Sequence, residues 1–241
     1  MRSERGPGAN SDGPAAQRLF AEGSGIYRDR VDAGRTLGAC LEQYRETGAL
    51  VLGIPRGGVP VAAEVARMLD AELDVIVARK LGAPGQRELA IGAVTSNGGK
   101  FLDENAIRGI GVTEQYLAKV IEAEMAEAHR REYEFRAGRR PARIENRVVI
   151  IVDDGLATGA TMRASVKSVR SREPAKLVVA VPVGSREACA ALKQEADEVV
   201  CPYQPVLFWA VGYHYENFEP TLDHDVLEIL RQFHGESVDA K

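Results

Sequence analysis

The chain has 241 residues, 45% of them hydrophobic, which is enough to bury the core of one ordinary to large domain. Its net charge of −4 argues against a general nucleic-acid binder, and no apolar run approaches a membrane span, which needs roughly 18 residues. The three cysteines, Cys40, Cys189 and Cys201, lack a CxxC pair, which argues against a disulfide framework or a zinc site and favours a reducing cytosol.

Residues 1–20 are rich in glycine, proline, serine and charge, and they predict a flexible N-terminal tail. From Val31 to Tyr44, apolar residues follow helical spacing, and Gly48 is the expected C-cap of that helix. Three arginines of this segment either reach a phosphate or lie in solvent at the helix ends, and the second interpretation is favoured: Arg28, Arg30 and Arg35.

The next apolar run, Leu50–Ile54, predicts a strand, and it ends in the residues Pro55, Arg56, Gly57 and Gly58. The helix that follows has Pro60 near its first turn. Glycines beside a basic residue at the end of a strand let consecutive N–H groups converge, so this turn predicts a concavity of the size of an anion.

Leu73–Ala78 predicts a third strand, which leads into a polar, glycine-bearing stretch that ends at Gly99. Residues 90–102 within and after this stretch predict a hairpin on a mobile excursion, because long loops inside compact domains are usually functional or disordered. Thr113–Arg136 then predicts a long helix with one apolar face. The basic cluster at 138–143 is either a solvated connector or a nucleic-acid contact, and the connector is favoured.

Residues 148–161 read VVIIVDDGLATGAT and join five β-branched residues to two acids and a turn of small and hydroxyl residues. The apolar run predicts a central strand buried on both faces of a parallel sheet. The turn from Gly155 to Thr161 leads into an apolar helical pattern, so its N–H groups and hydroxyls can hold a phosphate monoester. Asp153 and Asp154 suit vicinal hydroxyls or a hydrated Mg²⁺ about one sugar away, and ribose 5-phosphate has that shape.

After this motif, the patterns predict a buried strand at Leu177–Val183, a short helix at Glu187–Lys193 and an apolar edge at Glu198–Cys201. Pro202–Pro220 holds much of the aromatic content of the chain, including Trp209. The amphipathic segment Asp223–Phe233 predicts a closing helix.

The motif VVIIVDDGLATGAT resembles the phosphoribosyl diphosphate (PRPP) binding motif of type I phosphoribosyltransferases, and the resemblance covers nearly all of residues 27–234. It implies an α/β fold with a mostly parallel twisted sheet, flanking helices, a flexible loop and a C-terminal hood at about residues 201–220, all in one domain from residue 21 to residue 241. The implied activity is Mg²⁺-dependent transfer of 5-phosphoribosyl from PRPP to a nitrogenous base, with release of pyrophosphate, in a cytoplasmic homo-oligomer such as a dimer that serves nucleotide salvage.

The resemblance also implies roles for individual residues. Asp153 and Asp154 would hold the ribose hydroxyls and the metal, and Gly155, Leu156, Ala157, Thr158, Gly159, Ala160 and Thr161 would hold the 5-phosphate. The diphosphate would lie on Arg56, Gly57 and Gly58, and the peptide bond before Arg56 would be cis. A mobile loop would close over the site through Lys80, a catalytic candidate, and through Arg87 and Glu88, for which a solvated loop is a comparable interpretation. The base would contact Trp209, Val211 and Tyr213, although Trp209 is equally consistent with core packing.

One position departs from the pattern of enzymes that act on 6-oxopurines. Those enzymes often carry a third acid where this chain has Ala157, and the resulting GLATG resembles the uracil-type motif, so the base stays undetermined. Two other functions stay open: a non-catalytic regulator that binds PRPP and contacts a nucleic acid or partner through residues 138–143, and a hydrolase of phosphorylated sugars that uses the same turn.

Overall fold

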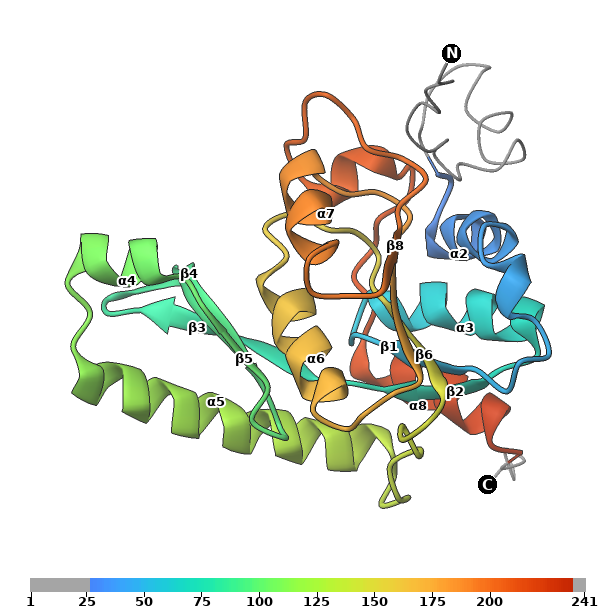
Figure 1. The fold of residues 1–241 in the computed structure, drawn as a ribbon, viewed down its shortest axis with the longest axis horizontal. Helices are drawn as coiled ribbons and strands as arrows, with labels where there is room; N and C mark the ends of the chain where they lie inside the picture. The colour runs from blue at the N-terminus through green and yellow to red at the C-terminus, as the bar shows by residue number, and fades with distance from the viewer. Residues whose placement is uncertain (1–26, 236–241) are drawn as a thin grey trace, which may run out of the picture.

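The computed structural model describes residues 27–235, without the side chain of Arg87, so the predicted tail at 1–20 lies outside the described residues. Its centre is a five-stranded parallel sheet in the order β2-β1-β6-β7-β8 (Figure 1). The strands are β1 (Leu50–Gly53), β2 (Glu72–Val75), β6 (Val148–Val152), β7 (Lys176–Ala180) and β8 (Glu198–Val200). The strand of the acidic motif, β6, is the middle one, and four of its five residues are buried, as its unbroken β-branched run predicted.

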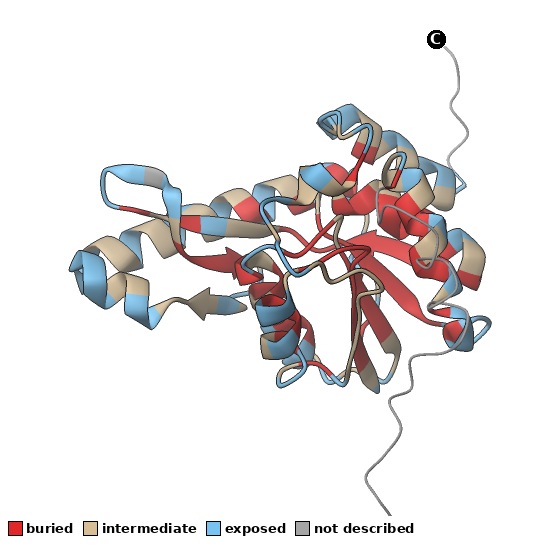
Figure 2. Cartoon of the chain, turned by 90° about the horizontal axis from the view of Figure 1, so that it is seen from above, coloured by how far each residue is buried: buried red, intermediate tan, exposed pale blue. Residues whose placement is uncertain are grey.

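Helices cover both faces of this sheet, and each face has its own apolar cluster (Figure 2). Alternate strand residues such as Val51 and Ile150 face α2 (Arg30–Ala39), α3 (Gly58–Leu69) and α8 (Asp223–Phe233). The residues between them, such as Leu52 and Ile151, face α6 (Ala160–Arg170) and α7 (Arg186–Leu192). The alternation follows from the period of two in a strand. A parallel sheet with helices on both faces confirms the predicted α/β class.

The first helix is shorter than its apolar pattern predicted. It ends at Ala39, and the chain then forms the 3₁₀ turn η1 (Glu42–Tyr44), in which Tyr44 joins the apolar cluster on that face of the sheet. Gly48 therefore does not cap the helix, and the prediction was wrong. It has a φ of +68° in the turn before β1, a conformation that favours glycine.

Residues 78–135 form an extension that we call the arm, which projects to the left in Figure 1. It contains a three-stranded antiparallel sheet in the order β3-β4-β5, made of β3 (Ala78–Ala83), β4 (Gln86–Thr95) and β5 (Lys100–Leu102). The helices α4 (Glu104–Ile110) and α5 (Glu114–Phe135) cover it and enclose an apolar cluster of their own. The predicted hairpin within residues 90–102 and the long helix are confirmed.

The rest of the arm corrects two predictions. The segment Leu73–Ala78 is not one strand, because β2 ends at Val75 in the parallel sheet and β3 begins at Ala78 in the antiparallel one. The glycine-bearing stretch after it is strand rather than loop. Within the confirmed hairpin, a Cβ at Gly92 would lie 2.4 Å from the carbonyl oxygen of Phe101, so this glycine permits the close approach of β5.

A buried ionic network joins the arm to the central sheet. Arg136 follows α5, and its Nε donates to Asp74 of β2 at 2.9 Å while its Nη1 donates to Glu132 at 3.1 Å. Glu132 also accepts a hydrogen bond from the backbone of Val77 at 3.0 Å and from the Ser96 hydroxyl at 2.7 Å. The network thus fixes the end of α5 to the segment that joins β2 to β3 and to the turn between β4 and β5.

The predicted strand, helix and edge after the acidic motif are confirmed as β7, α7 and β8, and α8 spans the predicted residues. Residues 201–220, which we call the hood, contain the 3₁₀ turn η2 (Val211–His214) and otherwise lack regular structure. The three cysteines are free thiols, as predicted. Within residues 27–235, we find no helix whose length and apolar character would let it cross a membrane.

Candidate functional site

The carboxyl ends of β1 and β6 lie side by side, because Gly53 pairs with Val152 in the parallel register. The turns after both strands open into one cleft of about 300 Å³. It is lined by Ile54, Pro55, Arg56, Gly57, Ala78, Lys80, Asp153, Asp154, Gly155, Leu156, Ala157, Thr158, Gly159, Thr161 and Val211. Two turns that lie about 100 positions apart in the sequence therefore share one site with the acidic pair.

The two aspartates lie at the junction of these turns. The backbone N–H of Asp154 donates to Oδ1 of Asp153 at 2.9 Å. Burial and the neighbouring Asp154 carboxylate raise the pKa of Asp153 well above its usual value, although Arg30 and Lys80 oppose the change. Burial also raises the pKa of Asp154, against the charge and hydrogen bond of Arg30. A cation bound between these carboxylates would reduce the repulsion between their negative charges.

The turn after β6 leads into α6 through Gly159, which has a φ of +76° at the N-cap. The first turn of an α-helix presents N–H groups and the positive end of its dipole, and here they face the cleft that Thr161 lines. The strap at residues 183–185 holds the turn from behind, since the N–H of Leu156 donates to Val183 at 2.9 Å and the hydroxyl of Ser185 donates to the carbonyl of Ala157 at 2.8 Å. These hydrogen bonds therefore fix the conformation of the turn in the ligand-free protein.

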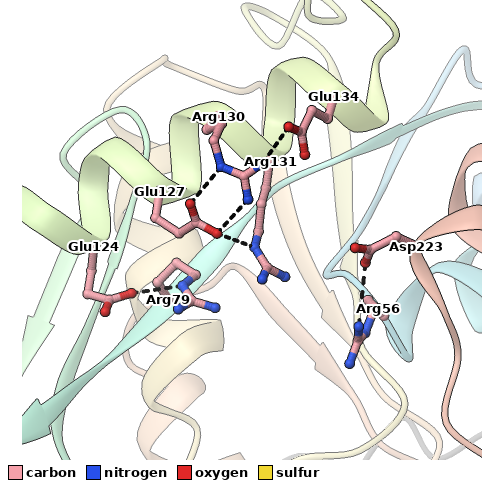
Figure 3. Close-up of polar contacts among 8 residues, drawn as sticks. All are labelled: Arg56, Arg79, Glu124, Glu127, Arg130, Arg131, Glu134 and Asp223. Atoms are coloured by element: carbon pink, nitrogen blue, oxygen red, sulfur yellow. Dashed lines mark hydrogen bonds and ion pairs between the residues drawn. The ribbon is translucent and has the colours of Figure 1, made fainter.

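The turn after β1 packs directly on the acidic pair. A Cβ at Gly57 would lie 1.9 Å from Oδ2 of Asp154, and one at Gly58 would lie 2.8 Å from Cα of Asp153, so no side chain fits at either position. The Pro55–Arg56 peptide bond is cis, as predicted. Arg56 is 44% exposed and forms an ion pair with Asp223 at the start of α8, with 3.5 Å between Nη1 and Oδ1 (Figure 3).

The arm contributes Lys80, which lies on β3 and lines the cleft. Its neighbour Arg79 points to α5 instead, where its Nε donates to Glu124 at 2.8 Å (Figure 3). Glu88 is exposed on β4 and does not line the cleft, and the side chain of Arg87 lies outside the described part of the chain.

The hood places the three predicted base-binding residues differently. Val211 lines the cleft, and a Cβ at Gly155 would lie 2.5 Å from its Cγ1, so the hood contacts the turn after β6. Trp209 and Tyr213 are 80% and 75% exposed and do not line the cleft. The alternative of a core Trp209 is therefore wrong, since a side chain packed in the interior loses nearly all of its exposure.

One more residue of the site differs from its sequence-based interpretation. A solvated helix end is the favoured interpretation of Arg30, but its side chain is 12% exposed and its Nε donates to Asp154 at 2.9 Å. The solvated interpretation fits Arg28 and Arg35 better, whose side chains are 69% and 62% exposed. The partner of Arg30 lies 124 positions along the chain, so no local pattern could indicate the pair.

The donor set of the cleft suits a magnesium ion that arrives with a phosphate ligand. Among residues 27–235, no group of three or more histidine, cysteine, aspartate or glutamate residues could hold a metal by itself. Mg²⁺ is commonly held by one or two carboxylates, with the remaining positions taken by water and substrate phosphates, and Asp153 and Asp154 provide such a pair.

The sequence and the fold of this chain are both similar to those of known proteins. The model of the phosphoribosyl transferase domain family matches residues 29–216. Two proteins of Mycobacterium tuberculosis, from strains H37Rv and CDC 1551 and provisionally named phosphoribosyl transferases, are each 43% identical to this chain over 215 residues. The match takes up 89% of this chain and 48% of each relative, so the chain spans about half of their length. The crystal structure of the protein TT1426 from Thermus thermophilus is 42% identical, with a TM-score of 0.73, and the match covers 86% of this chain and 99% of that one.

Proposed function

Because this chain belongs to the phosphoribosyl transferase family, we propose that it transfers the 5-phosphoribosyl group of PRPP to a nitrogenous base, with the help of Mg²⁺, and releases pyrophosphate. The observation that carries the proposal is the convergence of two glycine-bearing turns on one acidic pair. PRPP carries a phosphate at one end and a diphosphate at the other, with the two ribose hydroxyls between them, and the cleft has a separate feature for each.

The proposed roles follow from position in the cleft. The turn from Gly155 to Thr161 at the start of α6 would hold the 5-phosphate. The turn Arg56–Gly58 would hold the diphosphate, whose negative charge Arg56 and Lys80 would balance. Asp153 and Asp154 would hold the ribose hydroxyls and the metal ion. When bound, Mg²⁺ would neutralise charge on the leaving diphosphate.

In the proposed reaction, a base nitrogen bonds to the anomeric carbon while the bond from that carbon to the diphosphate oxygen breaks. The ribose passes through an oxocarbenium-like state, so the site needs fixed charges and positioning more than a nucleophilic side chain. Ala157 offers no proton acceptor, and it is exposed at the mouth of the phosphate turn. The base must therefore release its proton without help from this position.

The test measures binding and turnover separately. Calorimetry with PRPP and Mg²⁺ should show binding to the native protein and none to the Asp153→Asn, Asp154→Asn double variant, which loses both carboxylates while it keeps the shape of the cleft. Unchanged affinity in the double variant would remove the proposal. Incubation with a panel of purine and pyrimidine bases, followed by detection of pyrophosphate and nucleotide, then identifies the acceptor.

The panel also decides between the enzyme and the non-catalytic regulator. The acidic pair, the Arg56 turn and Lys80 all face the cleft, and this complete set favours the enzyme. A regulator would bind PRPP with the same dependence on Asp153 and Asp154 but would release no pyrophosphate with any base.

A further inference from the structure

Arg30 connects three parts of the molecule through one guanidinium group. Its Nε donates to Oδ2 of Asp154 at 2.9 Å, and its Nη1 donates to the backbone carbonyl of Glu219 at 2.8 Å. Its Cζ also lies 3.9 Å from the centre of the Phe218 ring, which is the distance of a cation–π contact. Asp154 belongs to the cleft, whereas Phe218 and Glu219 belong to the hood.

The ion pair lies under the turn that follows β1. A Cβ at Gly57 would lie 3.1 Å from Nε of Arg30, so the guanidinium and the carboxylate both touch this turn. The hood also reaches the same aspartate by a second path, since the Tyr215 hydroxyl donates to the backbone carbonyl of Asp154 at 2.6 Å. Asp154 is thus held from the first helix of the fold and from the hood at once.

Both halves of the pair are largely removed from water, with side-chain exposures of 12% for Arg30 and 15% for Asp154. A carboxylate in such surroundings stays charged at moderate cost only when a cation and hydrogen bonds compensate for its lost hydration. Lysine could supply the charge. It could not stack a planar group on Phe218 while donating to two acceptors in different directions, which is the property that distinguishes arginine.

We propose that Arg30 is a positioning residue that fixes the carboxylate of Asp154 and couples the acidic pair to the hood. A ligand that binds Asp154 would then change the hood, where the base is expected. The PRPP site and the base site would be coupled through Arg30 although they share no side chain. The proposal rests on the proposed function for the identity of its ligand, PRPP, but the coupling between Arg30 and the hood can be measured without a ligand.

The first experiment measures hydrogen–deuterium exchange of the hood in the ligand-free protein. Arg30→Met and Arg30→Lys should both speed exchange in residues 201–220, because neither side chain can make the hood contacts of the guanidinium. The matched control is Arg35→Met, which removes an exposed arginine from the same helix and its 3.1 Å ion pair with Glu64. Hood exchange in Arg30→Met equal to that of Arg35→Met would overturn the coupling.

The second experiment measures the affinity for PRPP in the presence of Mg²⁺. Arg30→Met should weaken it about tenfold to a hundredfold, the effect of losing one hydrogen bond to a charged group. Arg30→Lys should stay close to the native affinity because it keeps a cation beside Asp154. If Arg30 served folding alone, hood exchange and PRPP affinity would change in parallel in both variants. The distinguishing result is an Arg30→Lys variant that binds PRPP with nearly native affinity while its hood still exchanges faster than in the native protein.

The outcomes separate this inference from the proposed function. Native protein that fails to bind PRPP refutes the proposed function, and the exchange experiment still decides whether Arg30 couples to the hood. Native protein that binds PRPP, with Arg30→Met and Arg35→Met equal in affinity, leaves the function intact and overturns the positioning role.

Discussion

At the scale of single residues, the exposed Trp209 has a simple physical consequence. Its side chain is 80% exposed on the hood, and the neighbouring Phe208 packs on His214 instead, with 5.4 Å between ring centroids. An indole that stays in water adds little to the free energy of folding, so most of the Trp209 side chain is free for a ligand to cover.

Replacement of Trp209 by alanine should therefore leave the melting temperature nearly unchanged and act on the base. We expect the free energy of base binding to weaken by about 1 to 3 kcal/mol, as for stacking on other aromatics, while PRPP affinity stays constant. As the one tryptophan of the chain, Trp209 also reports on its own environment through fluorescence when bases are added to the PRPP-loaded native protein. Equal binding of the base by the alanine variant would exclude the stacking role.

Arg56 gives a second prediction at this scale. Its ion pair with Asp223 is exposed on both sides, so the diphosphate must compete with Asp223 for the guanidinium (Figure 3). Asp223→Asn should tighten pyrophosphate binding by up to about fivefold, the scale of an exposed ion pair. Glu228→Gln, an exposed charge change on the same helix, is the control. Pyrophosphate affinity that rises equally in both variants would reflect net charge and not competition.

The residues of the site differ in how far the sequence could predict them. Asp153, Asp154, Arg56 and the two glycines after it could be predicted, because each lies within a few positions of a strand end. Arg30 and the strap residue Ser185 could not, because their partners in the site are 124 and 28 positions away. Contacts over such distances are set by the packing of whole elements, which no short pattern encodes.

At the scale of elements, the edge strands depend on ionic contacts more than the central ones do. Glu198 of β8 accepts from Nζ of Lys176 on β7 at 2.7 Å and from the hydroxyl of Tyr44. Burial pushes the pKa of Glu198 up, but the hydrogen bonds from Lys176 and Tyr44 outweigh it, so the pKa lies below its usual value. The charged form of Glu198 therefore stabilises this edge of the sheet.

The pH dependence of this contribution has a defined sign. A carboxyl with a depressed pKa in the folded state contributes stability that is present above its unfolded pKa, about 4.3, and is lost as the pH falls through the folded value. The difference in unfolding free energy between native protein and Glu198→Gln should thus be largest near neutral pH and shrink as the pH falls below the unfolded pKa of about 4.3. Urea unfolding at several pH values measures it, with the exposed Glu122→Gln as control. A difference that grows on acidification would contradict the assignment.

The elements themselves follow from the sequence more readily than their partners do. The strands β1, β6 and β7 were predicted because short apolar runs between helical patterns are typical of buried strands in a parallel sheet. The part of the arm up to Gly99 was predicted as a loop with a hairpin, because its glycines and polar residues hide the alternation of β4. Its Pro84–Gly85 turn, between the paired residues Ala83 and Gln86, is the local signal that indicates a hairpin instead.

At the scale of the whole molecule, the cleft lies where the arm meets the central sheet. The central sheet supplies the acidic pair and both turns that line the cleft, while the arm supplies Lys80 from β3. The arm has an apolar cluster of its own, and its residues Ala93 and Phe101 also pack against Ala160 and Ala164 of α6. The position of Lys80 relative to Asp153 therefore depends on this contact with α6 and on the junction at the end of α5, where Asp74, Glu132 and Arg136 form their buried network.

This junction yields the last prediction. Arg136→Met leaves Asp74 and Glu132 as buried carboxylates without their cation, which should lower the free energy of unfolding by about 3 to 5 kcal/mol. The matched control on α5 is Arg130→Met, whose ion pairs with Glu127 and Glu134 lie in solvent, so its loss should change the free energy of unfolding much less (Figure 3).

The same variant tests whether the arm acts as part of the site. If the network holds Lys80 over the cleft, Arg136→Met should weaken PRPP binding at a temperature where it is still fully folded, and Arg130→Met should not. Adding Asp74→Asn and Glu132→Gln to Arg136→Met removes the unpaired charges, so it should recover part of the stability. It would not recover the PRPP affinity, because the bonds that fix the arm stay lost. Affinity that returns together with stability would mean that the junction serves folding alone.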